Sequence, residues 1–294
     1  MANKPRIAFC FSWQARTLDQ TYLFFQKNLF DAAKEQWFDY DIFCAVEDDE
    51  DVDKVNLLNS TKVEKIKSSE IGKVIDIKYW DFIKTAFKTK YKRAYYSYTW
   101  VVRYLQQIYK VSRSIKLCGN HNYDIIIRLR FDTIFINKFD FKKIQSKIKD
   151  WNNIICNDQD CHSILWKICY STWEIQDFIF IWNRISMNFL WDMFENFEQC
   201  FLWHEVEPIF KPIYRLSNFL VKILLYINNN TRIHIPSLPK EFWAYMIFIP
   251  EKAYYEYFLF KKTNVIKIDL SLFIIRKDIK QSYIRLEKKT LYEI

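Results

Sequence analysis

Apolar runs of strand length recur through the first half of the chain, and each ends in polar residues. The first two are Arg6 to Ser12 and Tyr40 to Val46, and a shorter one is Val63 to Ile66. Between the first two, Leu18 to Glu35 places apolar residues three or four positions apart, which is the period of an amphipathic helix. A strand, a helix and a second strand in this order predict a right-handed unit with two parallel strands.

A further run, Tyr123 to Asp132, ends in two arginines and an aspartate. Its three consecutive β-branched isoleucines predict a strand buried within a covered parallel sheet. Ligands of open α/β sheets bind at the carboxyl ends of the strands, so Arg128, Arg130 and Asp132 predict a site for an anion and an accompanying metal ion. The alternative is a structural ion pair that caps the strand.

The rest of the chain predicts further helices and short strands. The predicted helices are Tyr79 to Cys118, Phe141 to Ile148, Asn183 to Phe197 and Pro250 to Phe260. The predicted strands are Ile134 to Ile136, Phe178 to Trp182, Val265 to Ile268 and Leu272 to Ile275. No internal repeat and no linker rich in Ser or Gly interrupts this pattern. We therefore expect one α/β domain, residues 1–294, with a mostly parallel sheet, helices on both faces and an irregular C-terminal region.

Glycine is nearly absent, which narrows the ways in which this chain can hold a phosphate. The 294 residues contain two glycines, Gly72 and Gly119. Neither the GxGxxG fingerprint nor the GxxxxGK[ST] loop is present, so dinucleotide-binding and P-loop mechanisms have no support in the sequence. Arginine, lysine, a metal ion or ordinary helix N-termini must bind any phosphate.

The formal net charge of +9 predicts attraction to an anionic partner. Three kinds of partner fit: a nucleotide-activated substrate, an anionic membrane surface or a nucleic acid. The lysines are spread along the chain without a purely basic tract, which is typical of a solvated surface. Basic residues interleaved with 19% aromatic residues also fit a nucleic-acid-binding protein, but no RNP, KH or zinc-finger pattern is present.

The seven cysteines are scattered, and several lie inside apolar runs. This pattern is typical of reduced cytosolic thiols that pack as small apolar groups. Cys156, Cys161, His162 and Cys169 are close in sequence but lack the paired CxxC of a zinc site. We find no signal peptide, and the longest apolar stretch is too short to span a bilayer, so we expect a cytoplasmic protein.

Charged residues follow three predicted strands, and parallel strands would bring them to one edge of the sheet. The motif Ser-x-Gln-x-Arg-Thr covers Ser12 to Thr17, an acidic turn begins at Glu47, and Arg-x-Arg-x-Asp ends at Asp132. A fourth acidic position, Asp177, precedes the aromatic strand Phe178 to Trp182. A Pro-Glu pair before a helix and a final Ile-Ile-Arg complete the order of motifs.

This order resembles bacterial and viral glycosyltransferases of the GT-A type that build surface polysaccharides. Residues 6–18, 123–135, 174–197 and 249–277 carry the resemblance. It implies a hexosyltransferase-like enzyme of capsule or lipopolysaccharide synthesis, with a GT-A-like fold. The enzyme would move a sugar from a nucleotide-diphosphate donor to a surface-glycan or lipid-linked acceptor. Residues 1–135 would form the nucleotide-sugar-binding half and residues 136–294 the acceptor-side half.

The resemblance also implies roles for individual residues. The substrate-binding residues would be Ser12, Gln14, Arg16, Glu47, Asp48, Arg128 and Arg130. Asp132 would be a catalytic residue that binds a divalent metal ion, Mn²⁺ or Mg²⁺. Asp177 would be the base that takes the proton of the acceptor hydroxyl. The basic surface would allow peripheral contact with the inner face of an anionic membrane, and no nucleic acid is expected as a partner.

Two positions depart from the pattern of this family. Trp13 stands where such proteins often have glycine, and Arg130 occupies the first acidic position of Asp-x-Asp. These departures put metal dependence in doubt, and they leave open a second reading, a catalytically inactive relative that acts as a scaffold.

Overall fold

The computed structural model describes residues 4–89, 98–119, 122–150, 152–157, 179–183, 192–198, 263–268 and 270–274. In chain order the elements are β1 (Arg6–Trp13), α1 (Leu18–Phe25), the π-helical turn η1 (Gln26–Phe30), α2 (Asp31–Glu35), β2 (Asp39–Glu47), the 3₁₀-helix η2 (Val52–Leu58), β3 (Lys62–Ile66), α3 (Ser68–Thr89), α4 (Tyr98–Lys116), β4 (Ile125–Arg130), β5 (Thr133–Phe135), α5 (Phe141–Lys147), β6 (Asn153–Asn157), β7 (Ile179–Trp182), β8 (Asn264–Ile268) and β9 (Leu272–Ile274).

Seven strands form one mixed, mostly parallel sheet in the order β3-β2-β1-β4-β7-β6-β8. Strands β1, β2, β3 and β4 run parallel to one another, and β8 runs parallel to β6. Strand β7 is antiparallel to both of its neighbours. A separate antiparallel pair joins β5 to β9. The predicted α/β fold with a mostly parallel sheet is therefore confirmed.

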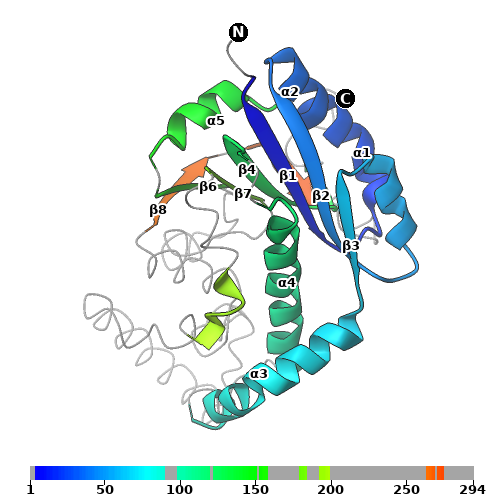
Figure 1. Cartoon of the computed structure of the whole chain (residues 1–294), viewed down its shortest axis with the longest axis vertical. Coiled ribbons are helices and arrows are strands. Elements are labelled where there is room, and N and C mark those ends of the chain that lie inside the picture. Colours follow the sequence, from blue (N-terminus) through cyan, green and yellow to red (C-terminus); the bar gives the residue numbers. More distant parts are fainter. Residues whose placement is uncertain are drawn as a thin grey trace, which may run out of the picture.

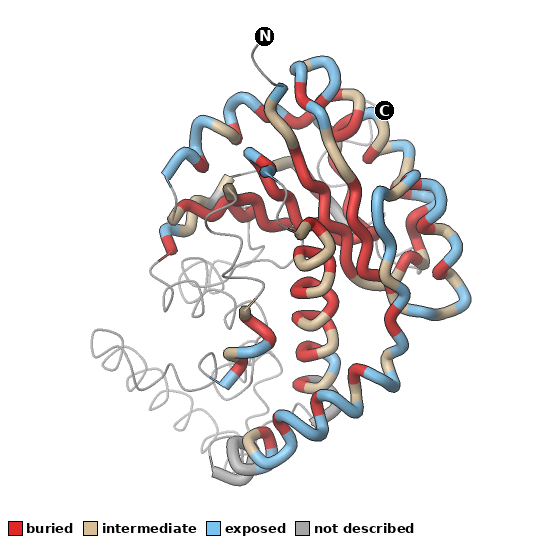
Figure 2. The backbone as a smooth tube through the Cα atoms, viewed as in Figure 1, coloured by how far each residue is buried: buried red, intermediate tan, exposed pale blue. Residues whose placement is uncertain are grey.

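Helices cover both faces of the sheet, as predicted (Figure 1). On one face, α1, η1, α2 and α5 pack against alternate residues of β1 and β4, including Phe9, Phe11 and Leu129. On the other face, α4 and the buried side of α3 pack against the residues in between, including Ala8, Cys10 and Ile126. Because successive side chains of a strand point to opposite faces, the near-continuous apolar runs of β1 and β4 suit a sheet covered on both sides. Figure 2 shows these central strands as buried along almost their whole length.

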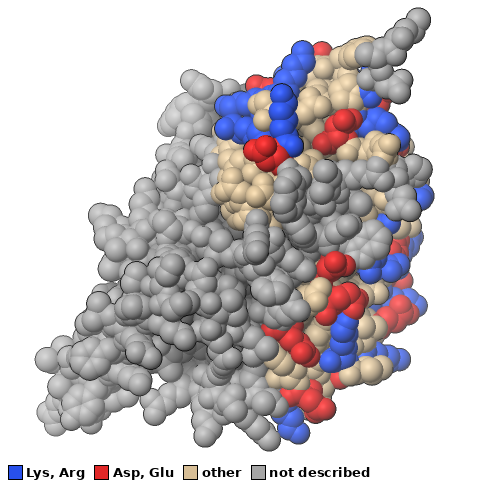
Figure 3. Space-filling model, turned by 60° about the vertical axis from the view of Figure 1, so that its left-hand side comes forward, with Lys and Arg blue, Asp and Glu red and all other residues tan. Residues whose placement is uncertain are grey.

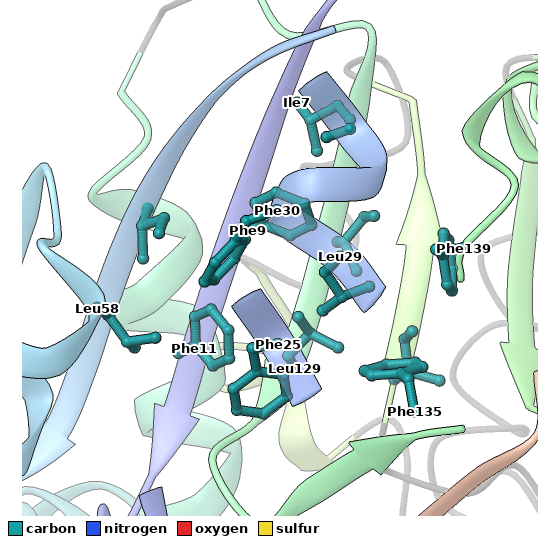
Figure 4. Packing of buried hydrophobic residues seen from close by; sticks show 14 of the residues in the cluster. Ile7, Phe9, Phe11, Phe25, Leu29, Phe30, Leu58, Leu129, Phe135 and Phe139 are labelled. Atoms are coloured by element: carbon teal, nitrogen blue, oxygen red, sulfur yellow. The ribbon is translucent and has the colours of Figure 1, made fainter. Parts of the chain in front are cut away.

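Phenylalanine side chains fill the face of the sheet under α1 and α5 (Figure 4). The Phe11 ring lies 5.1 Å from the Phe25 ring, edge to face, and stacks on the Phe131 ring at 5.4 Å. The Phe9 ring meets the Phe30 ring at 5.3 Å. Edge-to-face and offset arrangements are the favoured geometries of aromatic pairs. Many of the aromatic residues that the structure describes therefore belong to the core.

Most predicted elements match the observed ones to within a residue or two. The predicted helix over Leu18 to Glu35 is confirmed as three consecutive helical segments, α1, η1 and α2. The predicted helix over Tyr79 to Cys118 is wrong in its start and its continuity, because the described residues form two helices that run in different directions (Figure 1). Residues 90–97, between these helices, are not among those described.

The start of α3 was missed because its apolar residues do not lie on one face. Ile71, Ile75 and Tyr79 are buried, but Ile77 is 88% exposed and Trp80 is 44% exposed. The apolar positions of α3 therefore lack the single-sided period that identifies an amphipathic helix. Strand β6 was also missed, since asparagines at both ends leave only three apolar residues in its centre.

The helix over Pro250 to Phe260 and most of the helix over Asn183 to Phe197 lie outside the described residues. In the part of the chain that the structure describes, no helix combines the length and the apolar character needed to cross a bilayer.

Candidate anion-binding site

The carboxyl ends of β1, β2 and β4 lie side by side. Ser12 of β1 pairs with Ala45 of β2 on one side and with Arg130 of β4 on the other. The loop that follows β1, the end of β2 at Glu47 and the turn after β4 therefore meet at one edge of the sheet. The predicted convergence of these three segments is confirmed.

Arg130 and Asp132 form a buried, two-pronged ion pair across the turn after β4. The Arg130 Nε donates to Asp132 Oδ1 at 2.8 Å, and Nη2 donates to Oδ2 at 2.6 Å. The two side chains are 9% and 2% exposed. Parallel hydrogen bonds of this kind fix the geometry of both groups. The ion pair that the sequence offered as an alternative is thus present, and both Asp132 oxygens accept from Arg130.

Helix α1 holds the turn that carries this ion pair. The Thr21 hydroxyl donates a 2.6 Å hydrogen bond to the Phe131 carbonyl oxygen. The side chain of Phe131 is held as well, because its ring stacks on the Phe11 ring of β1. The turn that carries Asp132 is therefore held by Thr21 of α1 and Phe11 of β1, two residues that the sequence did not assign to the site.

Arg128 lies deeper on the same face of β4. Arg128 and Arg130 are two positions apart and pair with Cys10 and Ser12 of β1, which confirms that they share one face. Arg128 is fully buried, and its Nε donates to Ser12 Oγ at 3.1 Å. Its guanidinium carbon lies 5.7 Å from the centre of the Phe180 ring. The structure thus brings Ser12 and Arg128 together in the interior, beneath Arg130.

Trp13, at the end of β1, contacts two cations through its ring. The Arg130 guanidinium carbon lies 5.2 Å from the ring centre, and Lys110 Nζ of α4 lies 5.5 Å from it. Both distances fall within the range of cation–π attraction. The Trp13 backbone has φ = 120°, in the region that favours glycine. Trp13 therefore joins β4 to α4 at the site while its own backbone is strained.

Lys110 also neutralises Glu47, the last residue of β2. Its Nζ donates to Glu47 Oε2 at 2.5 Å, and the Ser68 hydroxyl donates to Oε1. Burial raises the pKa of Glu47, but the charge of Lys110 and the hydrogen bonds from Lys110, Ser68 and Gln14 outweigh burial, so the pKa lies below its ordinary value. Glu47 is therefore held as a carboxylate beside the cations around Trp13.

Sequence reasoning missed Lys110 and Ser68. Lys110 is 2% exposed and lies within the buried face of α4, between Ile108 and Val111. A lysine embedded among the apolar positions of a predicted helix is a detectable signal, because buried lysines are rare unless they are paired. Ser68 has no comparable signal, since it begins a helix whose start was not predicted.

Four buried polar atoms near this edge have no hydrogen-bond partner among the described residues. Trp13 Nε1 lies at the end of β1, and Arg16 Nε and Thr17 Oγ1 lie in the segment that follows it. The fourth is Gln107 Nε2, on α4 one turn before Lys110. Buried polar groups are nearly always hydrogen-bonded, so unpartnered donors require an explanation. A ligand rich in acceptor oxygens would satisfy them.

Three predicted residues remain to be placed, Arg16, Asp48 and Asp177. Arg16 is half-buried, and its carbonyl oxygen accepts from Lys54 Nζ at 2.8 Å. Asp48 is exposed, and its backbone N–H donates to the Ile66 carbonyl oxygen at 2.9 Å. Asp177 lies outside the described residues, so its assignment as a base stays a prediction.

The described residues do not form a metal-binding group. Within them, no three His, Cys, Asp or Glu side chains lie close enough to hold one ion. At Asp132, the proposed ligand, both oxygens already accept from Arg130. For the zinc hypothesis, Cys156 is buried in β6, and the other three residues lie outside the described ranges. The divalent metal ion stays a prediction of the sequence.

Surface charge does not form a single basic patch on the face shown in Figure 3. There, Lys and Arg side chains of the described residues lie interspersed with Asp and Glu. In the described structure, exposed cations can be paired: Lys138 pairs with Glu35, and Lys65 pairs with Asp53. Exposed pairs of this kind contribute little to stability and are typical of a solvated surface.

The site lies in an α/β protein with a mixed, mostly parallel sheet, at the carboxyl ends of its central strands. No family model matches the sequence, and no curated protein matches it. Among solved structures, the apo form of the bifunctional glycosyltransferase WbbM aligns with a TM-score of 0.33 and 10% identity, over 67% of this chain and 35% of that chain. The chain thus spans about a third of that protein. The apo form of mouse xyloside xylosyltransferase 1 aligns with a TM-score of 0.34 and 10% identity, over 66% of this chain and 75% of that chain.

Proposed function

We propose that this protein is a glycosyltransferase that moves a sugar from a nucleotide-diphosphate donor to a surface-glycan or lipid-linked acceptor. The observation that carries the proposal is the group of cations and unpartnered donors where β1, β2 and β4 end. Lys110 and Arg130 flank Trp13, and the buried nitrogens of Trp13, Arg16 and Gln107 have no acceptor in the described structure. The resemblance of the motif order to GT-A glycosyltransferases is the reason for proposing sugar transfer as the reaction.

A diphosphate fits this edge because it offers many acceptor oxygens and negative charge. Water is largely excluded around Lys110 and Arg130, which are 2% and 8% exposed. Preorganised donors in such surroundings stabilise developing charge much more strongly than they would in water. Glu47 and Asp132 hold Lys110 and Arg130 in place through ion pairs. In this proposal Glu47 also accepts a hydrogen bond from the ribose or base of the donor.

In the proposed reaction, the bond between the anomeric carbon and the diphosphate oxygen breaks, and the diphosphate leaves with the electron pair. Arg130 and Lys110 stabilise its added charge. The acceptor hydroxyl oxygen forms the new bond to the anomeric carbon, and its proton passes to Asp177 acting as a base. No step is assigned to a metal ion, because the described side chains around Asp132 do not fit one. Donor binding is assigned to residues 1–135 and acceptor binding to residues 136–294.

A thermal-shift screen of nucleotide sugars, with and without Mn²⁺, tests the binding part of the proposal. A ligand that binds the native state raises the unfolding temperature by mass action. We expect at least one nucleotide sugar to stabilise the protein, and the matching nucleoside diphosphate to do so as well. Stabilisation without measurable donor hydrolysis or transfer would favour the inactive scaffold, and no stabilisation by any member would contradict donor binding.

A further inference from the structure

Trp13 is the most unusual residue of the site. Its φ of 120° lies where bulky side chains are rarely found. Strained conformations of this kind persist only where the surrounding structure enforces them, and they gather at binding and catalytic sites. The indole is half-buried, and its Nε1 is inaccessible to water and has no acceptor among the described residues.

The ring also keeps two like charges close together. Lys110 and Arg130 come from different elements, α4 and β4, and both lie against the one indole. Lys110 and Arg130 repel each other because both are positively charged, but the negative face of the aromatic ring attracts each of them. Each cation is paired with a carboxylate, Lys110 with Glu47 and Arg130 with Asp132. An anionic ligand that lies beside the ring would meet both cations.

We propose that Trp13 is a specificity-determining residue that recognises the diphosphate of the ligand, with the indole N–H donating to a phosphate oxygen. This inference rests on the proposed function and deepens it. The ring orders Lys110 and Arg130 on either flank of the same anion, and the N–H adds a donor that glycine at this position would lack. The strained backbone of Trp13 places the indole in this position.

Trp37 offers a matched control at the other end of the sheet. It also has a positive φ, 70°, and its ring lies 5.9 Å from a cation, Lys4 Nζ. Trp37 comes just before β2 begins, whereas Trp13 ends β1 at the opposite edge. A substitution at Trp37 therefore reproduces the loss of an indole, a cation–π contact and a positive-φ residue, away from the site.

The test compares Trp13→Phe, Trp13→Gly, Trp37→Phe and Trp37→Gly with the wild type. The probes are inorganic pyrophosphate and the diphosphates ADP, CDP, GDP and UDP, titrated by calorimetry at a temperature where circular dichroism shows every variant folded. Trp13→Phe keeps a ring and loses the N–H, so the dissociation constant of the bound probe should rise about 10-fold, as for one hydrogen bond to a charged group. Trp13→Gly loses both the ring and the N–H and should bind the probe more weakly still. Both Trp37 variants should bind it as tightly as the wild type.

A second measurement identifies the indole directly. In a ¹H–¹⁵N spectrum, the side-chain resonance that disappears in Trp13→Phe belongs to Trp13, and it should shift when the bound probe is added to the wild type. Unchanged affinity in both Trp13 variants, or a Trp13 resonance that does not move, would overturn the inference while leaving the proposed function intact. Failure of the wild type to bind any of the probes would overturn both.

Discussion

The Arg130 guanidinium and the Asp132 carboxylate face each other with two parallel hydrogen bonds, although only Phe131 separates them in the chain. Phe131 turns into the core against Phe11, and the two charged side chains therefore project together at the end of β4. An anion that reaches Arg130 finds a guanidinium already fixed in orientation, which lowers the entropy lost on binding.

We expect Asp132→Asn to destabilise the fold as well as the site. Removing one partner of a buried ion pair leaves an uncompensated charge, and such changes lower the free energy of unfolding by about 3 kcal/mol or more. Urea unfolding measures this change. The double variant Arg130→Met, Asp132→Leu should recover much of the loss, because it leaves no unpaired charge. Equal stability of Asp132→Asn and the wild type would refute a structural role for the pair.

A second prediction concerns Arg130→Lys, which keeps the charge but loses the planar fork. Lysine cannot donate the two parallel hydrogen bonds that Asp132 accepts, and it stacks less well on Trp13. We expect nucleoside diphosphate binding to weaken by about 1 to 3 kcal/mol, the range for hydrogen bonds to charged groups. Titration calorimetry on the folded protein gives this value. Lower thermal stability with unchanged affinity would leave Arg130 a purely structural residue.

Lys110→Met should weaken both folding and ligand binding. The variant leaves Glu47 half-buried beside Ser68 without its counter-charge. Adding Glu47→Gln removes the isolated charge, so the double variant should regain stability but not affinity. Urea unfolding and calorimetry of the three proteins separate the two effects. If the double variant binds as tightly as the wild type, Lys110 serves only to neutralise Glu47.

The lowered pKa of Glu47 makes stability depend on pH in a defined direction. A carboxyl group whose pKa is lower in the folded state contributes stability above its unfolded pKa, near 4.5, and this contribution is lost as the pH falls through the folded pKa. Asp41 behaves alike at the opposite end of the sheet. Burial raises the pKa of Asp41, but the hydrogen bonds from Tyr123 and Arg6 and the charge of Arg6 outweigh burial, so the pKa lies below its ordinary value.

Unfolding temperatures measured from neutral pH down to about pH 3 should therefore fall for the wild type, and less steeply for Glu47→Gln. Asp41→Asn should also flatten the profile but leave diphosphate binding unchanged. Identical profiles for the wild type and Glu47→Gln would show that Lys110 does not hold Glu47 in its charged form.

Asp177→Asn tests the residue that the sequence assigns as a base. We expect sugar transfer to be abolished and donor affinity to be kept, because a base acts only as the transition state forms. Transfer rates and donor dissociation constants are measured on the same preparation. A parallel loss of affinity and rate would place Asp177 beside the nucleotide, and a lower unfolding temperature with normal transfer would make it a structural cap.

The sequence predicted the parts of the fold that depend on local pattern. Apolar runs of strand length identified β1, β2 and β4, and their parallel order placed Ser12, Glu47 and Arg130 at one edge. Strand alternation also predicted that Arg128 and Arg130 share a face. These inferences succeed because the side-chain period of a strand follows from backbone geometry alone.

What the sequence did not predict depends on contacts between distant segments. The depth of Arg128 depends on Phe180 of β7, and the charge state of Glu47 depends on Lys110, 63 residues away. The sequence treated Trp13 as a departure from a family pattern, since neither its backbone angle nor its two cations can be read from neighbouring residues. Local periodicity carries no information about which side chains meet across elements.

The central claim is that the edge formed by β1, β2 and β4 binds the diphosphate of a sugar donor, and donor cleavage tests it most directly. The measurement is the release of nucleoside diphosphate from a panel of nucleotide sugars by the wild type, by Glu47→Gln with Lys110→Met, and by the control Arg6→Gln at the other end of the sheet. We expect the wild type to cleave at least one donor, the double variant to do so about 100-fold more slowly, and the control to match the wild type. Equal rates in the wild type and the double variant, or no cleavage of any donor by the wild type, would contradict the account.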